Sequence, residues 1–177
     1  MEEKNKIVIL MVLAGLGFLV RLLPHPWNFS PVPGIAIFAA VYLGGRKSLF
    51  LPIFILFLSD IFLGFYEWKL MLAVYLSLFL CPLIGFWLKK HKKWQIVVGS
   101  SLLCSVSFFF ITNLAVWAFT SWYPKSFSGL IQCYLAAMPF FRNTLLGNFF
   151  YTVGFFGIYE ILIRAREGLQ SRREIRV

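Results

Sequence analysis

Long apolar runs, separated by short charged or proline- and glycine-containing segments, organise this chain. The runs predict helices over 7–23, 32–45, 48–65, 70–88, 94–119 and 143–163. An α-helix needs roughly 20 apolar residues to cross the hydrocarbon core of a bilayer, and most of these runs approach that length. The second run is shorter and ends in a glycine pair, so we expect it to span incompletely. The pattern predicts an all-α membrane protein, a single transmembrane domain over 1–177 built as a bundle of six helices.

One apolar segment does not fit this series. It covers 129–141, contains Pro139 near its end and is followed directly by Arg142. At about 13 residues it is too short to cross a bilayer, and a proline commonly ends or kinks a helix. We predict an extra interfacial or re-entrant segment that ends at Pro139 and lies over the bundle before the last helix.

Composition supports the membrane class. Hydrophobic residues make up 60% of the 177 residues, and only 14% are charged. A soluble domain of this size has too small an interior to bury so much apolar surface. The net charge of +10 is concentrated in a few positions between the runs, which argues against a nucleic-acid surface.

The basic residues give the predicted helices an orientation. If the six helices alternate in direction, 13 of the 17 Lys and Arg residues fall on the side that holds both termini, and Arg21, Lys69, Lys125 and Arg142 fall on the other. Cytoplasmic loops are enriched in Lys and Arg, so both termini are expected in the cytoplasm. We interpret the basic clusters as topology signals that also contact anionic lipids.

Polar residues within the runs gather at one predicted depth, near the outer face. A polar side chain inside a membrane is costly unless it is paired or hydrated, so this convergence predicts an outward-facing cavity rimmed by aromatic residues. Arg21 and Arg142 would bind an anionic group, with Asp60 balancing them in one cluster. The candidate binding residues are Arg21, His25, Trp27, Asn28, Asp60, Asn113, Trp117, Tyr134, Arg142, Asn143 and Asn148.

Each of these residues also has a purely structural interpretation. Asp60 would neutralise an arginine, the asparagines would join helices by hydrogen bonds, and His25, between two prolines, would shape a loop. The tryptophans and tyrosines would form an interfacial belt. The three cysteines, Cys81, Cys104 and Cys133, lack CxxC or metal-type spacing and are interpreted as small buried hydrophobic residues.

Catalytic patterns are lacking. The chain has no His/carboxylate cluster, no Gly-x-Ser-x-Gly sequence and no nucleotide-binding loop. We therefore predict no enzymatic activity, no cofactor and no metal site, and favour a transporter or substrate-binding subunit for a small organic molecule. Two alternatives stay open: a structural or assembly protein that binds another membrane protein, and a membrane enzyme acting on lipid, with Asp60 and His25 as its acid-base pair.

Four stretches carry a family resemblance: RLLPHPWNF at 21–29, LSDIFLG at 58–64, FFITNLAVW at 109–117, and 129–143. They resemble DUF6580, a family of bacterial membrane proteins described as transport proteins. The likeness covers about 21–157 and implies a transport role in a bacterial cytoplasmic membrane.

The layout is also similar, more distantly, to the S components of energy-coupling factor vitamin transporters, including the solitary cobalamin carriers. Those have six helices, both termini inside and a vitamin pocket near the outer face, which implies a vitamin or cofactor precursor as substrate. For a corrinoid, His25 and Cys81 would be the candidate axial ligands. The Ala-x-x-x-Ala pattern that docks S components on a coupling module is absent from the first helix, which has Ala14-Gly15-Leu16-Gly17 instead. A stripe of small residues on the second helix, Ala36, Ala40 and Gly44, would permit close helix packing.

Overall fold

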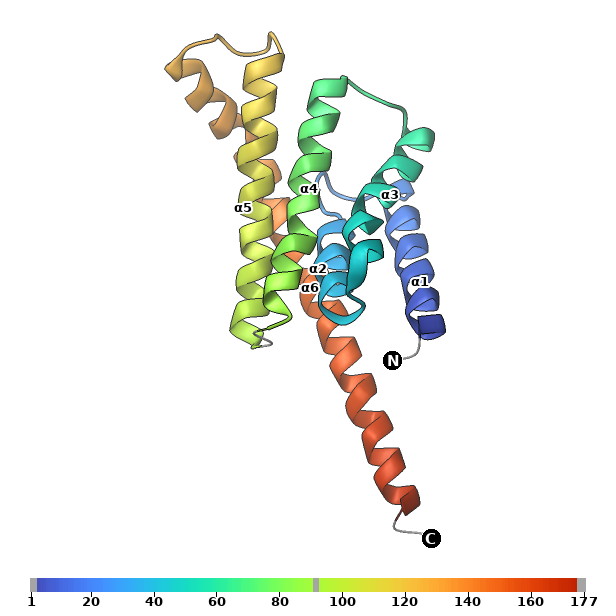
Figure 1. Ribbon diagram of the computed structural model, residues 1–177. Helices are drawn as coiled ribbons and strands as arrows, with labels where there is room; N and C mark the ends of the chain where they lie inside the picture. The colour runs from blue at the N-terminus through green and yellow to red at the C-terminus, as the bar shows by residue number, and fades with distance from the viewer. Residues whose placement is uncertain (1–2, 91–92, 175–177) are drawn as a thin grey trace.

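Six helices connected by short segments form the protein in a computed structural model (Figure 1). The structure describes the backbone of residues 3–90 and 93–174 and the side chains of residues 4–90 and 93–164. No strand occurs in these residues. The helices are α1 Glu3–Leu22, α2 Val32–Tyr42, α3 Gly45–Leu63, α4 Trp68–Leu88, α5 Trp94–Phe119 and α6 Phe127–Glu174. The predicted all-helical fold is confirmed, and the first five helices begin and end within a few residues of the predicted bounds.

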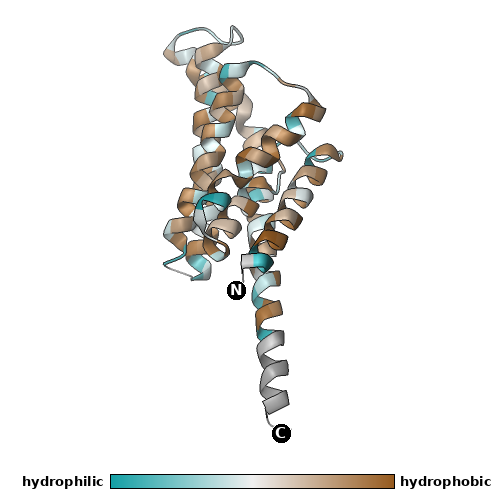
Figure 2. Ribbon diagram, turned by 45° about the vertical axis from the view of Figure 1, so that its right-hand side comes forward, coloured by the Kyte–Doolittle hydropathy of each residue, from teal (hydrophilic) through white to brown (hydrophobic). Residues whose placement is uncertain are grey.

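Hydrophobic residues predominate along the helices (Figure 2), and many large ones are exposed on the outside of the bundle as well as buried in its interior. Among the described residues, four helices are long and apolar enough to cross a membrane: Lys4–Leu22, Trp68–Leu88, Trp94–Phe119 and Phe127–Arg164. Exposed aromatic residues such as Phe54, 54% exposed, and Phe150, 62% exposed, suit contact with lipid rather than with water. Both chain ends lie at the same end of the bundle (Figure 1).

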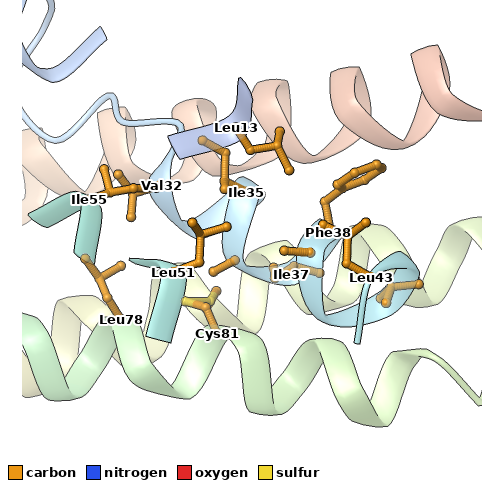
Figure 3. Close-up of a cluster of buried hydrophobic side chains, with 14 of the residues drawn as sticks. Leu13, Val32, Ile35, Ile37, Phe38, Leu43, Leu51, Ile55, Leu78 and Cys81 are labelled. Carbon is orange, nitrogen blue, oxygen red and sulfur yellow. A yellow bond between two sulfur atoms is a disulfide. The ribbon is translucent and has the colours of Figure 1, made fainter. Parts of the chain in front are cut away.

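The short helix α2 is the centre of the core. Every residue from 31 to 41 is buried, and α2 packs against all five other helices (Figure 3). Gly85 of α4 permits the closest approach, because a Cβ there would lie 2.7 Å from Ala40 Cβ and 2.8 Å from the carbonyl oxygen of Ile37. The small residues of α2 therefore serve packing within the chain. At 11 residues, α2 is only about 16 Å long and cannot span a bilayer by itself.

The last helix corrects one prediction. Residues 127–174 form a single 48-residue helix with Pro139 inside it, so 129–141 is not a separate segment that ends at the proline. A proline removes one backbone hydrogen bond, but a long apolar helix tolerates this loss where neighbouring turns stay bonded. The helix starts beside the preceding loop, where a Cβ on Gly129 would lie 2.0 Å from the Pro124 carbonyl oxygen.

Two of the cysteines form a bond that their spacing did not predict. Cys81 of α4 and Cys104 of α5, whose Cα atoms are 5.6 Å apart, form a disulfide in the core. All three cysteines are buried, as predicted, but the disulfide between two of them was not anticipated from their spacing. Cys133 is free and buried, and its thiol contacts the Asn113 carbonyl oxygen at 3.4 Å.

Candidate functional site

A cavity of about 460 Å³ lies at the end of the bundle opposite the chain termini. It forms where the C-terminal end of α1, the loop 23–31 and the segment 64–67 meet α4, α5 and α6. We call it the polar cavity. Its lining residues are Arg21, His25, Trp27, Asn28, Ser30, Pro33, Leu63, Tyr66, Val74, Leu78, Phe108, Thr144 and Asn148. Five of the eleven candidate binding residues are therefore brought together here.

Arg21 is held at the wall of this cavity by a charged network. Its Nη2 donates to Asp60 Oδ1 at 2.6 Å and its Nε donates to Ser59 Oγ at 2.6 Å. The second carboxylate oxygen accepts from the Tyr75 hydroxyl at 2.8 Å. Asp60 is only 2% exposed and lies behind Arg21 rather than on the cavity surface. Both carboxylate oxygens are thus hydrogen-bonded, which is what a charge at this depth requires.

The loop between α1 and α2 presents three of the candidate side chains. His25 Nδ1 contacts the Leu23 carbonyl oxygen at 2.7 Å; a carbonyl can only accept, so Nδ1 donates and the neutral ring keeps its lone pair on Nε2. Asn28 occupies a left-handed conformation, φ 63°, which asparagine tolerates better than most residues. The loop backbone rests on α6, where a Cβ on Gly147 would lie 3.0 Å from Phe29 Cα. This packing fixes the loop over the polar cavity.

A smaller cavity of about 200 Å³ adjoins the first. The two share four lining residues, Asn28, Val74, Phe108 and Thr144. Asn113 lines the smaller one, with its Nδ2 donating to the Phe109 carbonyl oxygen at 2.8 Å. The predicted site therefore extends between α5 and α6.

Asn148 combines the two roles weighed for the asparagines. Its Nδ2 donates to Ser105 Oγ at 2.7 Å, joining α6 to α5, and Ser105 donates on to the Ser101 carbonyl oxygen at 2.9 Å. The same side chain lines the polar cavity although only 1% of the residue is exposed. It is both an interhelical hydrogen bond and part of the cavity wall.

Sequence comparison identifies the family of this chain. The model of a family of unknown function, DUF6580, matches residues 1–170. The chain belongs to the DUF6580 family. No similar protein was found among curated proteins, and no similar fold among solved structures. Family membership thus carries no activity, and the function of this DUF6580 chain has to be argued from its cavities.

Besides Asp60, four candidate residues of the DUF6580 chain line neither cavity. Trp117 Nε1 donates to the Pro124 carbonyl oxygen at 3.0 Å, and the Tyr134 hydroxyl donates to the Phe110 carbonyl oxygen at 2.8 Å. Both bonds stabilise the connection between α5 and α6. Asn143 is half-buried outside the cavities, and Arg142 is exposed.

The exposure of Arg142 corrects the expected two-arginine cluster. Among the described residues, Asp60 forms an ion pair with Arg21 and with no other cation. Because α6 continues unbroken through 142, the register of the helix turns this side chain to the outside of the bundle. One arginine against one aspartate leaves the polar cavity close to neutral, so the argument for an anionic ligand no longer holds.

Sequence reasoning missed Tyr66. It follows Gly64, whose φ of 93° ends α3, and it lines the polar cavity close to Asp60 and Arg21. Tyr66 is 44% exposed, and its partial burial, with the nearby Asp60 carboxylate, raises its pKa to about 12. Its hydroxyl therefore stays protonated and can donate at physiological pH. The available signal was its position six residues after Asp60, just past the helix end.

The geometry gives little support to the alternatives that involve a metal or acid-base chemistry. No group of three or more His, Cys, Asp or Glu gathers in the part of the chain that the structure describes. Cys81 is bonded to Cys104, so its sulfur is not a free ligand for a corrinoid. Asp60 is hydrogen-bonded to Arg21 and Tyr75, and His25 Nδ1 to the Leu23 carbonyl oxygen.

Proposed function

We propose that this chain is a membrane transporter, or the substrate-binding subunit of one, for a small and largely neutral organic molecule. The observation that carries the proposal is the polar cavity. Its volume of about 460 Å³ falls within the range of ligand pockets, roughly 300–1,000 Å³. Its lining mixes hydrogen-bonding groups with aromatic and aliphatic surface, as is typical of sites that bind organic molecules rather than ions.

The short helix α2 supports this proposal. It starts at the cavity, where Ser30 and Pro33 are lining residues, and its buried N-terminus directs the positive end of the helix dipole there. Broken or short helices that begin at a binding site are a recurring device of transporters. An electron-rich group of the ligand, such as a carbonyl oxygen, would lie at this helix start beside Arg21.

The layout also agrees with an S-component-like carrier. Both termini lie at one end of the bundle and the polar cavity at the other. With the basic clusters in the cytoplasm of a bacterium, the cavity would open outward, as needed for uptake of a vitamin or cofactor precursor. Without the docking pattern on α1, we favour a solitary carrier over a subunit that requires an ATPase module.

Mass spectrometry of small molecules retained by the purified protein tests the proposal. We expect a retained compound in the wild-type protein and its loss in Val74→Phe, which fills both adjoining cavities. Leu76→Phe is the matched control, because Leu76 is 55% exposed on the same helix and the added ring would face lipid. Both variants should remain monodisperse in detergent.

The structural or assembly alternative makes the opposite prediction. It draws support from Arg21, Asp60, Tyr75 and Ser59, whose polar groups satisfy one another within the chain. If the wild-type protein retains no compound, and Val74→Phe and Leu76→Phe behave alike in an uptake assay, this alternative replaces transport.

Topology has its own test. A single cysteine introduced at Lys90 should react only with a reagent that reaches the cytoplasm, and one at Trp122 only with a reagent added outside. Both residues are exposed. Lys90 follows the end of α4 and Trp122 follows the end of α5, and these two helix ends lie at opposite ends of the bundle (Figure 1). Reaction of both from the same side would contradict the orientation.

A further inference from the structure

A second large cavity, of about 430 Å³, lies at the end of the bundle that holds the chain termini. It forms between the start of α1, the turn from α2 to α3 and the end of α4, and we call it the basic cavity. Its lining residues are Lys6, Leu10, Leu43, Gly44, Gly45, Arg46, Lys47 and Lys89. Four of the eight carry a positive charge, and no acidic residue is among them.

The start of α3 adds to this positive character. Gly44 and Gly45 have φ of 64° and 75°, so the chain turns sharply here and the helix begins without a side-chain cap. The first amide N–H groups of a helix have no partner within it and attract anions. Lys89 reaches this turn from α4, with Nζ 3.3 Å from the position that a Cβ on Gly44 would occupy. Cations from three helices thus surround one uncapped helix start.

An apolar groove of about 420 Å³ continues from the basic cavity along α1 and α3. The two share Leu10 and Lys47 as lining residues. The other residues of the groove are Ile7, Met11, Ala14, Phe50, Leu51 and Phe54. Met11, Phe50 and Phe54 are each more than half exposed, so the groove lies open on the outer surface of the bundle.

We propose that an anionic phospholipid binds here, with its phosphate in the basic cavity and one acyl chain in the groove. The two parts of the site match the two parts of such a molecule. Arg46 and Lys89 have no acidic residue beside them in the cavity lining. A neutral lipid would leave these two cations without a counter-ion, and a soluble phosphate compound would leave the groove empty. Contacts between phosphate and Lys or Arg are strong, charge-assisted hydrogen bonds, and lipid headgroups commonly bind basic pockets between helices.

Native mass spectrometry of the detergent-purified protein measures this binding directly. The probes are phosphatidylglycerol, phosphatidylcholine with the same chains, and glycerol 3-phosphate. We expect phosphatidylglycerol to bind on the order of tenfold more tightly than phosphatidylcholine, since each basic group near a headgroup contributes. Tighter or equal binding of glycerol 3-phosphate would overturn the lipid assignment in favour of a soluble anion.

Charge removal tests the headgroup site. Arg46→Gln combined with Lys89→Gln should weaken phosphatidylglycerol binding on the order of tenfold and leave phosphatidylcholine binding unchanged. Lys90→Gln combined with Lys93→Gln is the matched control, since it removes two exposed cations at the same end that do not line the cavity. Equal losses in the two double variants would mean non-specific attraction and would contradict a built site.

Filling the groove tests the acyl chain. Ala14→Phe should weaken phosphatidylglycerol binding several-fold without affecting glycerol 3-phosphate. Val12→Phe is the control and should have no effect, because Val12 lies on the same helix, is 63% exposed and does not line the groove. An unchanged affinity in folded Ala14→Phe protein would remove the groove from the proposal. Thermal unfolding without added lipid verifies that every variant is folded.

Discussion

The polar cavity and the basic cavity lie at opposite ends of the same helices, and they differ in whether their basic residues lie beside an acidic one. In the polar cavity one arginine is neutralised inside the fold, by Asp60, and is held in place by Ser59. In the basic cavity four cations from three helices line the surface without an acidic lining residue. A charge that the fold neutralises fixes the shape of a wall, whereas Arg46 and Lys89, which have no acidic neighbour in the cavity lining, can attract a ligand. We therefore expect a neutral ligand at one end and an anion at the other.

The largest expected effect concerns the arginine that the fold neutralises. Arg21→Gln leaves the Asp60 carboxylate, 2% exposed, without its cation, and should lower the free energy of unfolding by about 3 kcal/mol. Arg46→Gln, at the basic cavity, should change it by less than about 0.5 kcal/mol in lipid-free detergent. Thermal unfolding of both variants provides the comparison. Similar losses would show that the two ends do not differ in the way described.

A double-mutant cycle separates the loss of the Arg21–Asp60 pair from independent destabilisation by each substitution. Asp60→Asn should be destabilising as well, and the double variant with Arg21→Gln should cost less than the two single changes added together. For a contacting pair that shares buried hydrogen bonds, we expect a coupling energy of roughly 1–3 kcal/mol. Additive losses would mean that the two side chains stabilise the bundle independently.

The wall between the two cavities is α2, and a smaller effect is expected there. Gly85→Ala places a Cβ 2.8 Å from the Ile37 carbonyl oxygen, and moving α2 to relieve this contact should cost about 2 kcal/mol. Gly99→Ala, with nothing within 4 Å of its Cβ, should be neutral or slightly stabilising because alanine favours helix. Gly85→Ala should also weaken ligand binding at both ends. Weakening at only one end would show that α2 does not couple them.

Tyr66 gives the smallest effect. Tyr66→Phe removes one hydroxyl from the polar cavity, and should weaken retention of the bound compound about threefold to tenfold, the value of one hydrogen bond. Lipid binding at the basic cavity should not change. The measurement is the amount of compound retained by the two proteins, and an equal amount would remove Tyr66 from the site.

The same residue predicts a pH effect on stability. The pKa of Tyr66 is raised to about 12 in the folded protein, above the value of about 10 for an unfolded tyrosine. The folded state therefore holds this proton more tightly, and its contribution to stability is complete below pH 10 and is lost as the pH rises from 10 to 12. Over this interval the melting temperature of the wild-type protein should fall more than that of Tyr66→Phe.

The sequence predicted this fold well where the physics is local. Long apolar runs specify helices by length alone, and the cost of a carboxylate in a membrane predicted that Asp60 would pair with an arginine. The sequence could not predict which way a side chain faces around a helix when the start of that helix was uncertain. Assigning a stop to Pro139 left the register of Arg142 open, and the continuous helix turns that side chain outward.

Other parts of the site depend on contacts between distant segments. The disulfide between Cys81 and Cys104 requires α4 and α5 to lie side by side at one height, which no spacing rule reveals. From the sequence, the basic residues of this cavity could be interpreted only as topology signals and lipid contacts, and not as the lining of a cavity. Its shape depends on two glycines at positive φ, which bring the start of α3 toward Lys89.

The length of α6 has a consequence for how the protein sits in a bilayer. The apolar stretch Phe127–Arg164 has 38 residues, about 57 Å of helix, against a hydrocarbon thickness of about 30 Å. Arg142 divides this stretch into two parts. The part from 143 to 164 measures about 33 Å, which is enough to cross the hydrocarbon core once. With the exposed Arg142 at headgroup level, the first four turns of α6 would stand above the hydrocarbon. Bilayer thickness would thus set the depth of the bundle, and a thicker membrane would draw those turns in.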